Sequence, residues 1–325
     1  MPSQVSLSFD KGKNSTCIAT VVGGDYDKEE LYLHDGAIEK SNKKGVRELE
    51  LGKHRLSMLP PRKQSEVMRI LQQAYAQGIP PEHLNMGHIP GAEDAYREML
   101  GEMETKGDKI IKLPMNSTFA LHPCRQEDKR EIWYIAGASG SGKSHIAKRL
   151  AEQYQKQFPD RPIYLVSKLN EDATLDSMKK PPIRLNVDKL VEEPMADLEP
   201  LRDSMILFDD YDTFTKPHDA IVQKLIDDIA TMGRHTNTTM LCMTHYLSNY
   251  KKTRLMLTEA THFVVYPQST GAHALNYLLK TYLGLAPKEV ADMRKTGSRW
   301  VCIHKNYPQH CVTENSAWLL NQVDE

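Results

Sequence analysis

From residue 108 onward, short apolar runs alternate with segments in which apolar residues recur at helical spacing. The runs "EIWYIAG", "PIYLVSKL", "DSMILFDDYD", "TTMLCMTH" and "HFVVYP" predict buried strands. The segments "SHIAKRLAEQYQKQF", "PHDAIVQKLIDDIATMGRH" and "GAHALNYLLKTYLG" predict helices. Strands that alternate with helices favour an α/β fold, in which helices flank both faces of a mostly parallel central sheet.

Shorter apolar runs lie at both ends of this unit, which we expect to span residues 108–325. "DKIIKLP" and "TFALHP" predict two strands before the first helix of the unit. Near the C-terminus, "SRWVCIHKN" and "HCVTEN" predict two strands that pair across the turn "YPQ".

Residues 1–107 are expected to form a separate accessory region with a small α+β structure. "STCIATVVGG" and "EELYLHDG" predict strands that end in turns. "PPRKQSEVMRILQQAYAQGIPP" predicts a helix because Val67, Ile70, Leu71 and Tyr75 share one face, and "GAEDAYREMLGEMETKG" predicts another. No motif in this region points to a chemical function.

Composition excludes some classes of protein. The formal net charge of -1 provides no global basic field, so nucleic-acid contacts must come from local patches. No apolar run reaches about 18 residues, so no membrane span is expected, and the first residues lack a signal-peptide pattern. The five cysteines are scattered and form no CxxC pair, which favours reduced thiols in an intracellular protein.

One stretch matches the phosphate-binding pattern GxxxxGK[ST], between a predicted strand and a predicted helix. Its glycines allow the backbone to curl so that successive N–H groups face phosphates, at the positive end of the helix dipole. The lysine can reach the β- and γ-phosphates of ATP, and the final serine can bind Mg²⁺. The predicted nucleotide-binding residues are Gly137, Ala138, Ser139, Gly140, Ser141, Gly142, Lys143 and Ser144.

Two acidic residues follow the apolar run "MILF". A buried strand that ends in carboxylates beside a phosphate loop suits magnesium, so we expect Asp209 to hold Mg²⁺ through water, together with Ser144. Asp210 is expected to orient the attacking water. The predicted cofactors are thus ATP and Mg²⁺. Asp212 is expected to be a turn or cap residue.

A short loop and a strand follow the next predicted helix. Arg234 in this loop is either an arginine finger, which is worth roughly 10³ to 10⁵ in rate, or a surface residue that binds helix-end carbonyls. The strand ends in Thr244 and His245. If this strand lies between the phosphate-loop strand and the acidic strand, one of these side chains can sense the γ-phosphate or hold the attacking water.

Taken together, "GASGSGKS", "ILFDD", "GRHTNTTMLCMTH", "NYKKTR" and "SRWVCIHKNYPQ" resemble the genome-packaging ATPases of nucleocytoplasmic large DNA viruses. These poxvirus-type ATPases belong to the FtsK/HerA superfamily of P-loop NTPases. The resemblance covers roughly Lys109 to Glu314. It implies a RecA-like core, a homo-oligomeric ring of five or six subunits, and ATP-driven movement of double-stranded DNA into a preformed capsid. It also implies a location in the host cytoplasm or the virion.

The resemblance extends to roles for single residues. It implies that Asp209 and Asp210 form the acidic pair and that Arg234 acts on a neighbouring subunit. In the bacterial pumps of the superfamily a glutamine ends the sensor strand, whereas this chain has Thr244 and His245; of the two, we name His245, with Asp210 and Arg234, as a catalytic candidate.

The predicted partners are double-stranded DNA of any sequence and a capsid or its packaging vertex. Basic loops in the pore of a ring can grip DNA phosphates, and the first candidates are Lys251, Lys252 and Arg254. Lys179 and Lys180 are a second, weaker pair. Two other functions stay open: a nucleotide-gated switch for capsid assembly, and a non-viral FtsK/HerA-type DNA-transfer ATPase.

Overall fold

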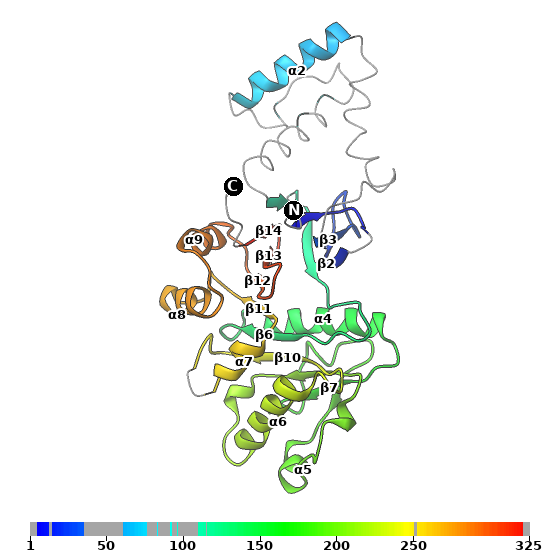
Figure 1. Cartoon of the computed structure of the whole chain (residues 1–325), viewed down its shortest axis with the longest axis vertical. Helices are drawn as coiled ribbons and strands as arrows, with labels where there is room; N and C mark the ends of the chain where they lie inside the picture. The colour runs from blue at the N-terminus through cyan, green and yellow to red at the C-terminus, as the bar shows by residue number, and fades with distance from the viewer. Residues whose placement is uncertain are drawn as a thin grey trace.

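The computed structural model of the chain describes residues 5–12, 15–35, 61–76, 83, 92, 96, 110–114, 116–249 and 252–320. Two β-sheets organise these residues (Figure 1). The predicted helix "GAEDAYREMLGEMETKG" falls, apart from Ala92 and Tyr96, outside the described residues.

The larger sheet has ten strands and confirms the predicted α/β fold. Its first half is antiparallel, and from β11 onward every neighbouring pair of strands is parallel. In spatial order the strands are β4 (Ile110–Lys112), β14 (Ser316–Leu319), β13 (His310–Thr313), β12 (Val301–His304), β11 (His262–Val265), β6 (Ile132–Ala136), β10 (Thr239–Thr244), β9 (Met205–Phe208), β7 (Ile163–Val166) and β8 (Ile183–Arg184).

The helical elements follow the strands along the chain. They are α2 (Pro61–Ala76), α4 (Lys143–Gln157), α5 (Val187–Glu192), η3 (Glu199–Leu201), η4 (Tyr211–Thr213), α6 (His218–Met232), α7 (Arg254–Glu259), α8 (Ala272–Tyr277), the π-helical turn η5 (Leu278–Tyr282) and α9 (Pro287–Lys295). In α2, Val67 and Leu71 are buried as the helical spacing predicts.

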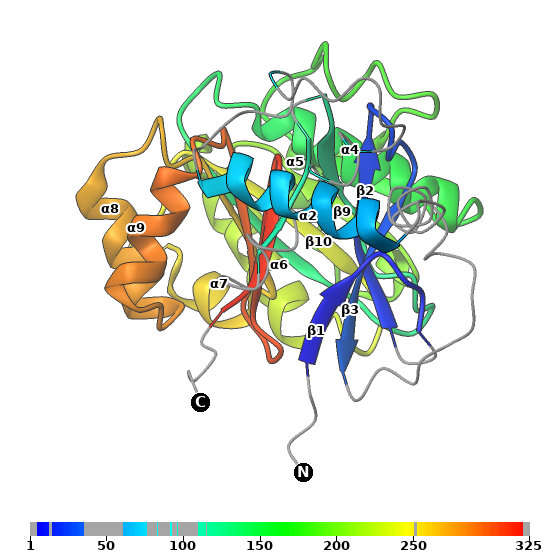
Figure 2. The same cartoon turned by 90° about the horizontal axis from the view of Figure 1, so that it is seen from above.

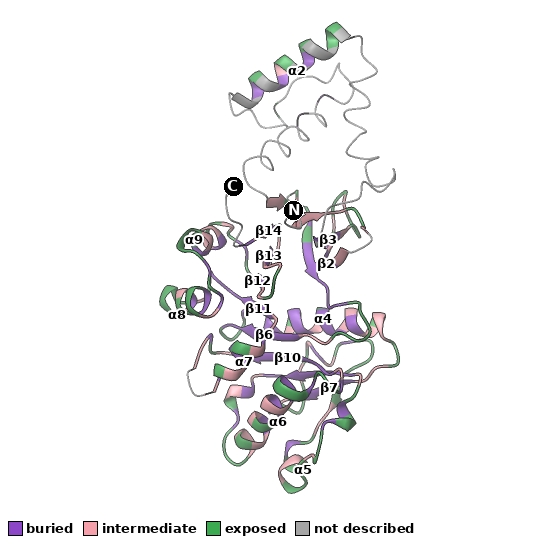
Figure 3. Ribbon diagram, viewed as in Figure 1, coloured by how far each residue is buried: buried purple, intermediate pink, exposed green. Residues whose placement is uncertain are grey.

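Both faces of the parallel half of the sheet are covered, which explains its continuously apolar strands. In β6, Trp133 and Ile135 pack in the same core as Ile146 and Leu150 of α4. The alternate residues of β6 pack in a second core with α6 and the helices after β10. The central strands are accordingly buried throughout (Figure 3), and α4 lies on the opposite side of the molecule from α8 and α9 (Figures 1 and 2).

The smaller sheet joins strands from both sides of residue 107. Its antiparallel order is β1 (Val5–Ser8), β3 (Glu30–Asp35), β2 (Ser15–Val22) and β5 (Thr118–Leu121). Ala19 of β2 and Phe119 of β5 share one core with α4. β5 lies against α4, the helix that follows the phosphate loop, and the first strands of the chain join the same core beside β5. A domain boundary at residue 107 stays a prediction.

Deleting the ring of Phe119 tests this packing. Phe119 is fully buried in the core shared with α4. We expect Phe119→Ala to lower the free energy of unfolding by about 3 to 5 kcal/mol, the usual cost of a buried phenylalanine. Urea unfolding followed by intrinsic fluorescence measures it. Tyr307→Ala is the control because Tyr307 is 76% exposed. A loss for Phe119→Ala no larger than the control's would contradict the packing.

Candidate active site

The phosphate loop connects β6 to α4 and has a backbone that depends on glycine. Gly142 has φ 108°, in the left-handed region that favours glycine. A Cβ atom on Gly137 would lie 2.5 Å from the Tyr266 ring, closer than any side chain tolerates. The loop therefore folds closely over Tyr266. The helix α4 begins at Lys143, one residue before the predicted start at Ser144.

Lys143 is directed back into the loop. Its side chain is 7% exposed, and its Nζ donates hydrogen bonds to the carbonyl oxygens of Gly137 at 3.0 Å and Ala138 at 3.5 Å. The same Nζ lies 3.4 Å from Asp210 Oδ1. A buried ammonium held between loop carbonyls and a carboxylate is placed to meet the negative charge of phosphates.

The three strands that carry the predicted site lie side by side, with β10 between β6 and β9. This is the strand order on which the prediction for Thr244 and His245 depended. The amide of Gly137 donates to the Thr244 carbonyl at 3.0 Å, so the phosphate loop begins directly beside the end of β10. The parallel strands thus present the loop, the acids and the polar end of β10 at one edge of the sheet.

The two acids after β9 have different surroundings. Asp209 is 5% exposed and accepts a hydrogen bond from Ser167 Oγ at 3.1 Å. Burial, reinforced by the neighbouring negative charge of Asp210, raises the pKa of Asp209 to about 6. Asp210 is more open, with 36% of its side chain exposed, and its backbone is left-handed at φ 41°. Such a conformation is unfavourable for a residue with a side chain and is frequent at functional sites.

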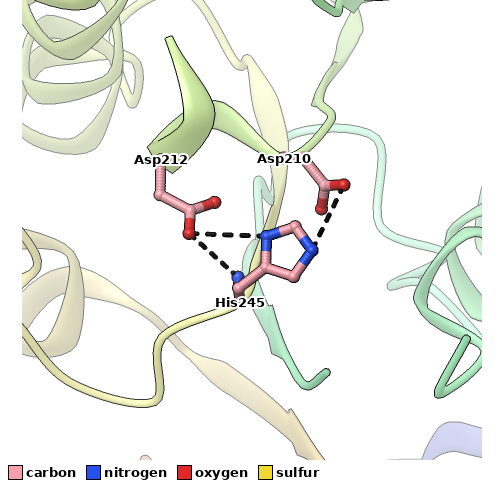
Figure 4. A group of neighbouring side chains, drawn as sticks. All are labelled: Asp210, Asp212 and His245. Carbon is pink, nitrogen blue, oxygen red and sulfur yellow. Dashed lines mark hydrogen bonds and ion pairs between the residues drawn. The ribbon is translucent and has the colours of Figure 1, made fainter. Parts of the chain in front are cut away.

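His245 contacts two carboxylates at once (Figure 4). Its Nε2 lies 3.5 Å from Asp210 Oδ2, and its Nδ1 lies 3.5 Å from Asp212 Oδ2. Thr244, in contrast, is fully buried, and its Oγ1 accepts a hydrogen bond from the Tyr246 amide at 3.2 Å. Of the two sensor candidates, His245 is the one whose side chain reaches an acid of the predicted site.

Arg234 lies away from this edge. It is exposed in the turn between α6 and the start of β10, whereas the phosphate loop follows the end of β6. Because β6 and β10 are parallel, Arg234 and the phosphate loop of the same chain lie at opposite edges of the sheet. In the described part of the chain, no hydrogen bond or ion pair holds its guanidinium.

The structure describes two of the three first DNA candidates. Lys252 forms an ion pair with Asp219 of α6 at 2.9 Å, and Arg254 begins α7. Lys251 lies outside the described residues. Of the weaker pair, Lys179 is exposed and Lys180 Nζ donates to the Pro159 carbonyl at 3.3 Å.

Sequence reasoning missed one contact to the phosphate loop. Arg299, on the segment before β12, donates from Nε to the Ser141 carbonyl at 3.0 Å and from a terminal nitrogen to the Gly140 carbonyl at 3.4 Å. Its own amide donates to Glu314 at 2.7 Å. Arg299 lies in the stretch "SRWVCIHKNYPQ", which contributed to the family resemblance, but sequence reasoning assigned it no role. Its partners are about half the chain away and accept through backbone oxygens.

We expect Arg299→Ala to loosen the phosphate loop and to weaken nucleotide binding about tenfold, the scale of one or two charge-assisted hydrogen bonds. Titration with a fluorescent ATP analogue measures the Kd. Arg299→Lys should restore part of the affinity, and Lys295→Ala, which removes a charge from a side chain that is 76% exposed, should leave it unchanged. Equal Kd values for Arg299→Ala and the wild type would exclude this role.

The chain has a relative among curated proteins. It is 35% identical over 224 residues to a protein of the Sputnik virophage, uncharacterized protein V3, and the match covers 68% of this chain and 89% of the relative. No family model matches the chain.

Solved structures also show similarity at low identity. The genome-packaging NTPase B204 of Sulfolobus turreted icosahedral virus 2, in complex with AMPPCP, is 14% identical with a TM-score of 0.39 over 60% of this chain and 98% of B204. The pCW3 conjugation coupling protein TcpA is 12% identical with a TM-score of 0.40 over 92% of this chain and 77% of TcpA. At such scores, neither similarity establishes a function for this chain.

Proposed function

We propose that this chain, which belongs to the family of the virophage protein V3, is an FtsK/HerA-type packaging ATPase that hydrolyses ATP to move double-stranded DNA into a preformed capsid. The observation that carries the proposal is the meeting of Lys143, Asp210 and His245 at one edge of the sheet.

The three side chains divide the work of phosphoryl transfer to water. Lys143 supplies positive charge to the phosphates, and the loop amides at the start of α4 bind them. Asp210, open enough to meet solvent, orients the attacking water and accepts its proton. His245 holds Asp210 from the other side and thereby fixes where that carboxylate points. A protein that only binds ATP as a switch needs neither of these two residues.

The oxygen atoms beside the loop fit Mg²⁺. Asp209 is a buried carboxylate whose pKa is raised to about 6, so a neighbouring cation would relieve the cost of its charge. Ser144, the second residue of α4, offers a hydroxyl. Carboxylate and hydroxyl oxygens are the ligands that Mg²⁺ prefers. When bound, Mg²⁺ would neutralise part of the negative charge of the phosphates.

The place of Arg234 favours action between subunits. The exposed guanidinium is at the opposite edge of the sheet from its own phosphate loop, so it can serve a nucleotide only on another copy of the chain. We therefore propose a homo-oligomeric ring in which Arg234 is the finger of the neighbouring site.

The connection from β10 to α7 supports coupling to DNA. It begins with His245 at the hydrolysis site and continues to Lys252 and Arg254. A conformational change at His245 can therefore be transmitted along this short connection to the basic side chains of Lys252 and Arg254. The ion pair between Lys252 and Asp219 is partly exposed, so DNA phosphates can compete for this lysine.

Steady-state ATP hydrolysis with and without long double-stranded DNA tests the proposal. We expect DNA to stimulate the wild type, and more strongly at low salt because the contacts are to phosphates. Lys143→Ala and Asp210→Asn should lower kcat by about 10² to 10³, the cost of losing a transition-state or proton-transfer group. Arg149→Ala, on the exposed surface of α4, is the control and should behave as the wild type.

Mixing experiments test the ring. Arg234→Ala alone should lose its activity, and adding Lys143→Ala subunits, which keep the arginine, should restore part of it. If ATP binds but DNA changes nothing even at low salt, the translocase proposal is wrong for the chain by itself and the assembly switch becomes the better function.

A further inference from the structure

Asp212 is a buried carboxylate that the proposed function does not use. Only 4% of its side chain is exposed. Its Oδ2 accepts a hydrogen bond from the backbone amide of His245 at 3.2 Å (Figure 4), and its Oδ1 is buried with no hydrogen-bond partner. A buried polar atom without a partner calls for a physical explanation, because leaving it unsatisfied costs folding free energy.

Capping of the end of β10 does not explain why residue 212 has a carboxylate side chain. A neutral asparagine can accept the same amide hydrogen bond with a far smaller cost of burial than a carboxylate. In the residues that the structure describes, the one basic side chain that pairs with Asp212 is His245, whose Nδ1 lies 3.5 Å from Oδ2. A carboxylate beside Nδ1 decides which ring nitrogen carries a proton and which direction the other nitrogen faces.

The backbone around His245 is already fixed. The Thr244 carbonyl accepts the Gly137 amide at 3.0 Å, and the Tyr246 carbonyl accepts the Tyr134 hydroxyl at 2.6 Å. The remaining freedom of His245 is rotation of its side chain. With Nδ1 held by Asp212, Nε2 is directed at Asp210, 3.5 Å away. Contacts of this length often shorten when the substrate binds.

We propose that Asp212 is a positioning residue of the ATPase site: it holds the His245 ring with Nδ1 toward its own carboxylate and Nε2 toward Asp210. This inference rests on the proposed role of His245 in ATP hydrolysis. Three successive contacts then connect the phosphate loop to the 3-10 turn η4: Lys143 with Asp210, Asp210 with His245, and His245 with Asp212.

A double-mutant cycle on the full chain tests it. Asp212→Asn keeps an acceptor for the His245 amide but removes the charge, and we expect kcat for ATP to fall about 10- to 100-fold, as when the partner of an orienting histidine is lost. The Kd for a fluorescent ATP analogue and the thermal midpoint should stay at the wild-type values. Asp212→Asn combined with His245→Gln should be no slower than His245→Gln alone.

The chain offers a matched control in a second aspartate–histidine pair. Asp188 Oδ1 lies 2.7 Å from His218 Nε2, and 78% of the Asp188 side chain is exposed. Asp188 belongs to α5, which follows the edge strand β8 and not the strands that carry the site. Asp188→Asn removes the same charge from the same kind of pair. It should leave kcat and the nucleotide Kd unchanged.

Nitrogen NMR of ¹⁵N-histidine-labelled protein gives a readout that a purely structural role would not move. At alkaline pH, where imidazoles are neutral, we expect the His245 ring, assigned by the signal lost in His245→Gln, to carry its proton on Nδ1. In Asp212→Asn the proton should shift toward Nε2.

The outcomes separate the two proposals. If His245→Gln leaves kcat unchanged, the role of His245 in the proposed function is wrong, and the inference about Asp212 is wrong with it. If His245→Gln lowers kcat but Asp212→Asn does not, Asp212 only caps β10, and the proposed function stands without it. A parallel loss of kcat, nucleotide affinity and thermal stability in Asp212→Asn would also overturn the positioning role.

Discussion

The hydrogen bond from the Gly137 amide to the Thr244 carbonyl joins the phosphate loop to the strand beside it, and the rest of the site depends on this junction. It exists because β10 is inserted between β6 and β9 with its last residue opposite Ala136. His245 thereby emerges next to the loop, within reach of the acids that follow β9. A shift of β10 out of this register would leave Lys143 and Asp210 in place. His245, which links them to the connection from β10 to α7, would no longer lie beside them.

The acidic residues differ in burial, and the tasks that we propose for them differ accordingly. Asp209 and Asp212 are nearly enclosed, and each is held by a neutral donor, Ser167 Oγ in one case and the His245 amide in the other. Asp210 lies between them in sequence, is partly open to solvent, and pairs with Lys143. A reacting water needs an accessible carboxylate, whereas a metal ligand or a positioning residue gains from being held still.

The sequence predicted the central strands, their helices and the phosphate loop because each depends on local signals: apolar runs, helical spacing and a glycine pattern. β14, β8 and α5 were not predicted, since they are short and their sequences carry no strong period. Arg299 and Asp212 were missed as site residues for a related reason. Their partners are a loop carbonyl and a strand-end amide, which only the folded chain brings close.

The central claim is that hydrolysis at this edge moves the chain along DNA. The most direct measurement is displacement of a third strand from double-stranded DNA by the assembled protein and ATP. Our account predicts that the wild type displaces the third strand and that Lys143→Ala and Asp210→Asn leave it in place. A wild-type protein that hydrolyses ATP on DNA while the third strand stays bound would contradict the account.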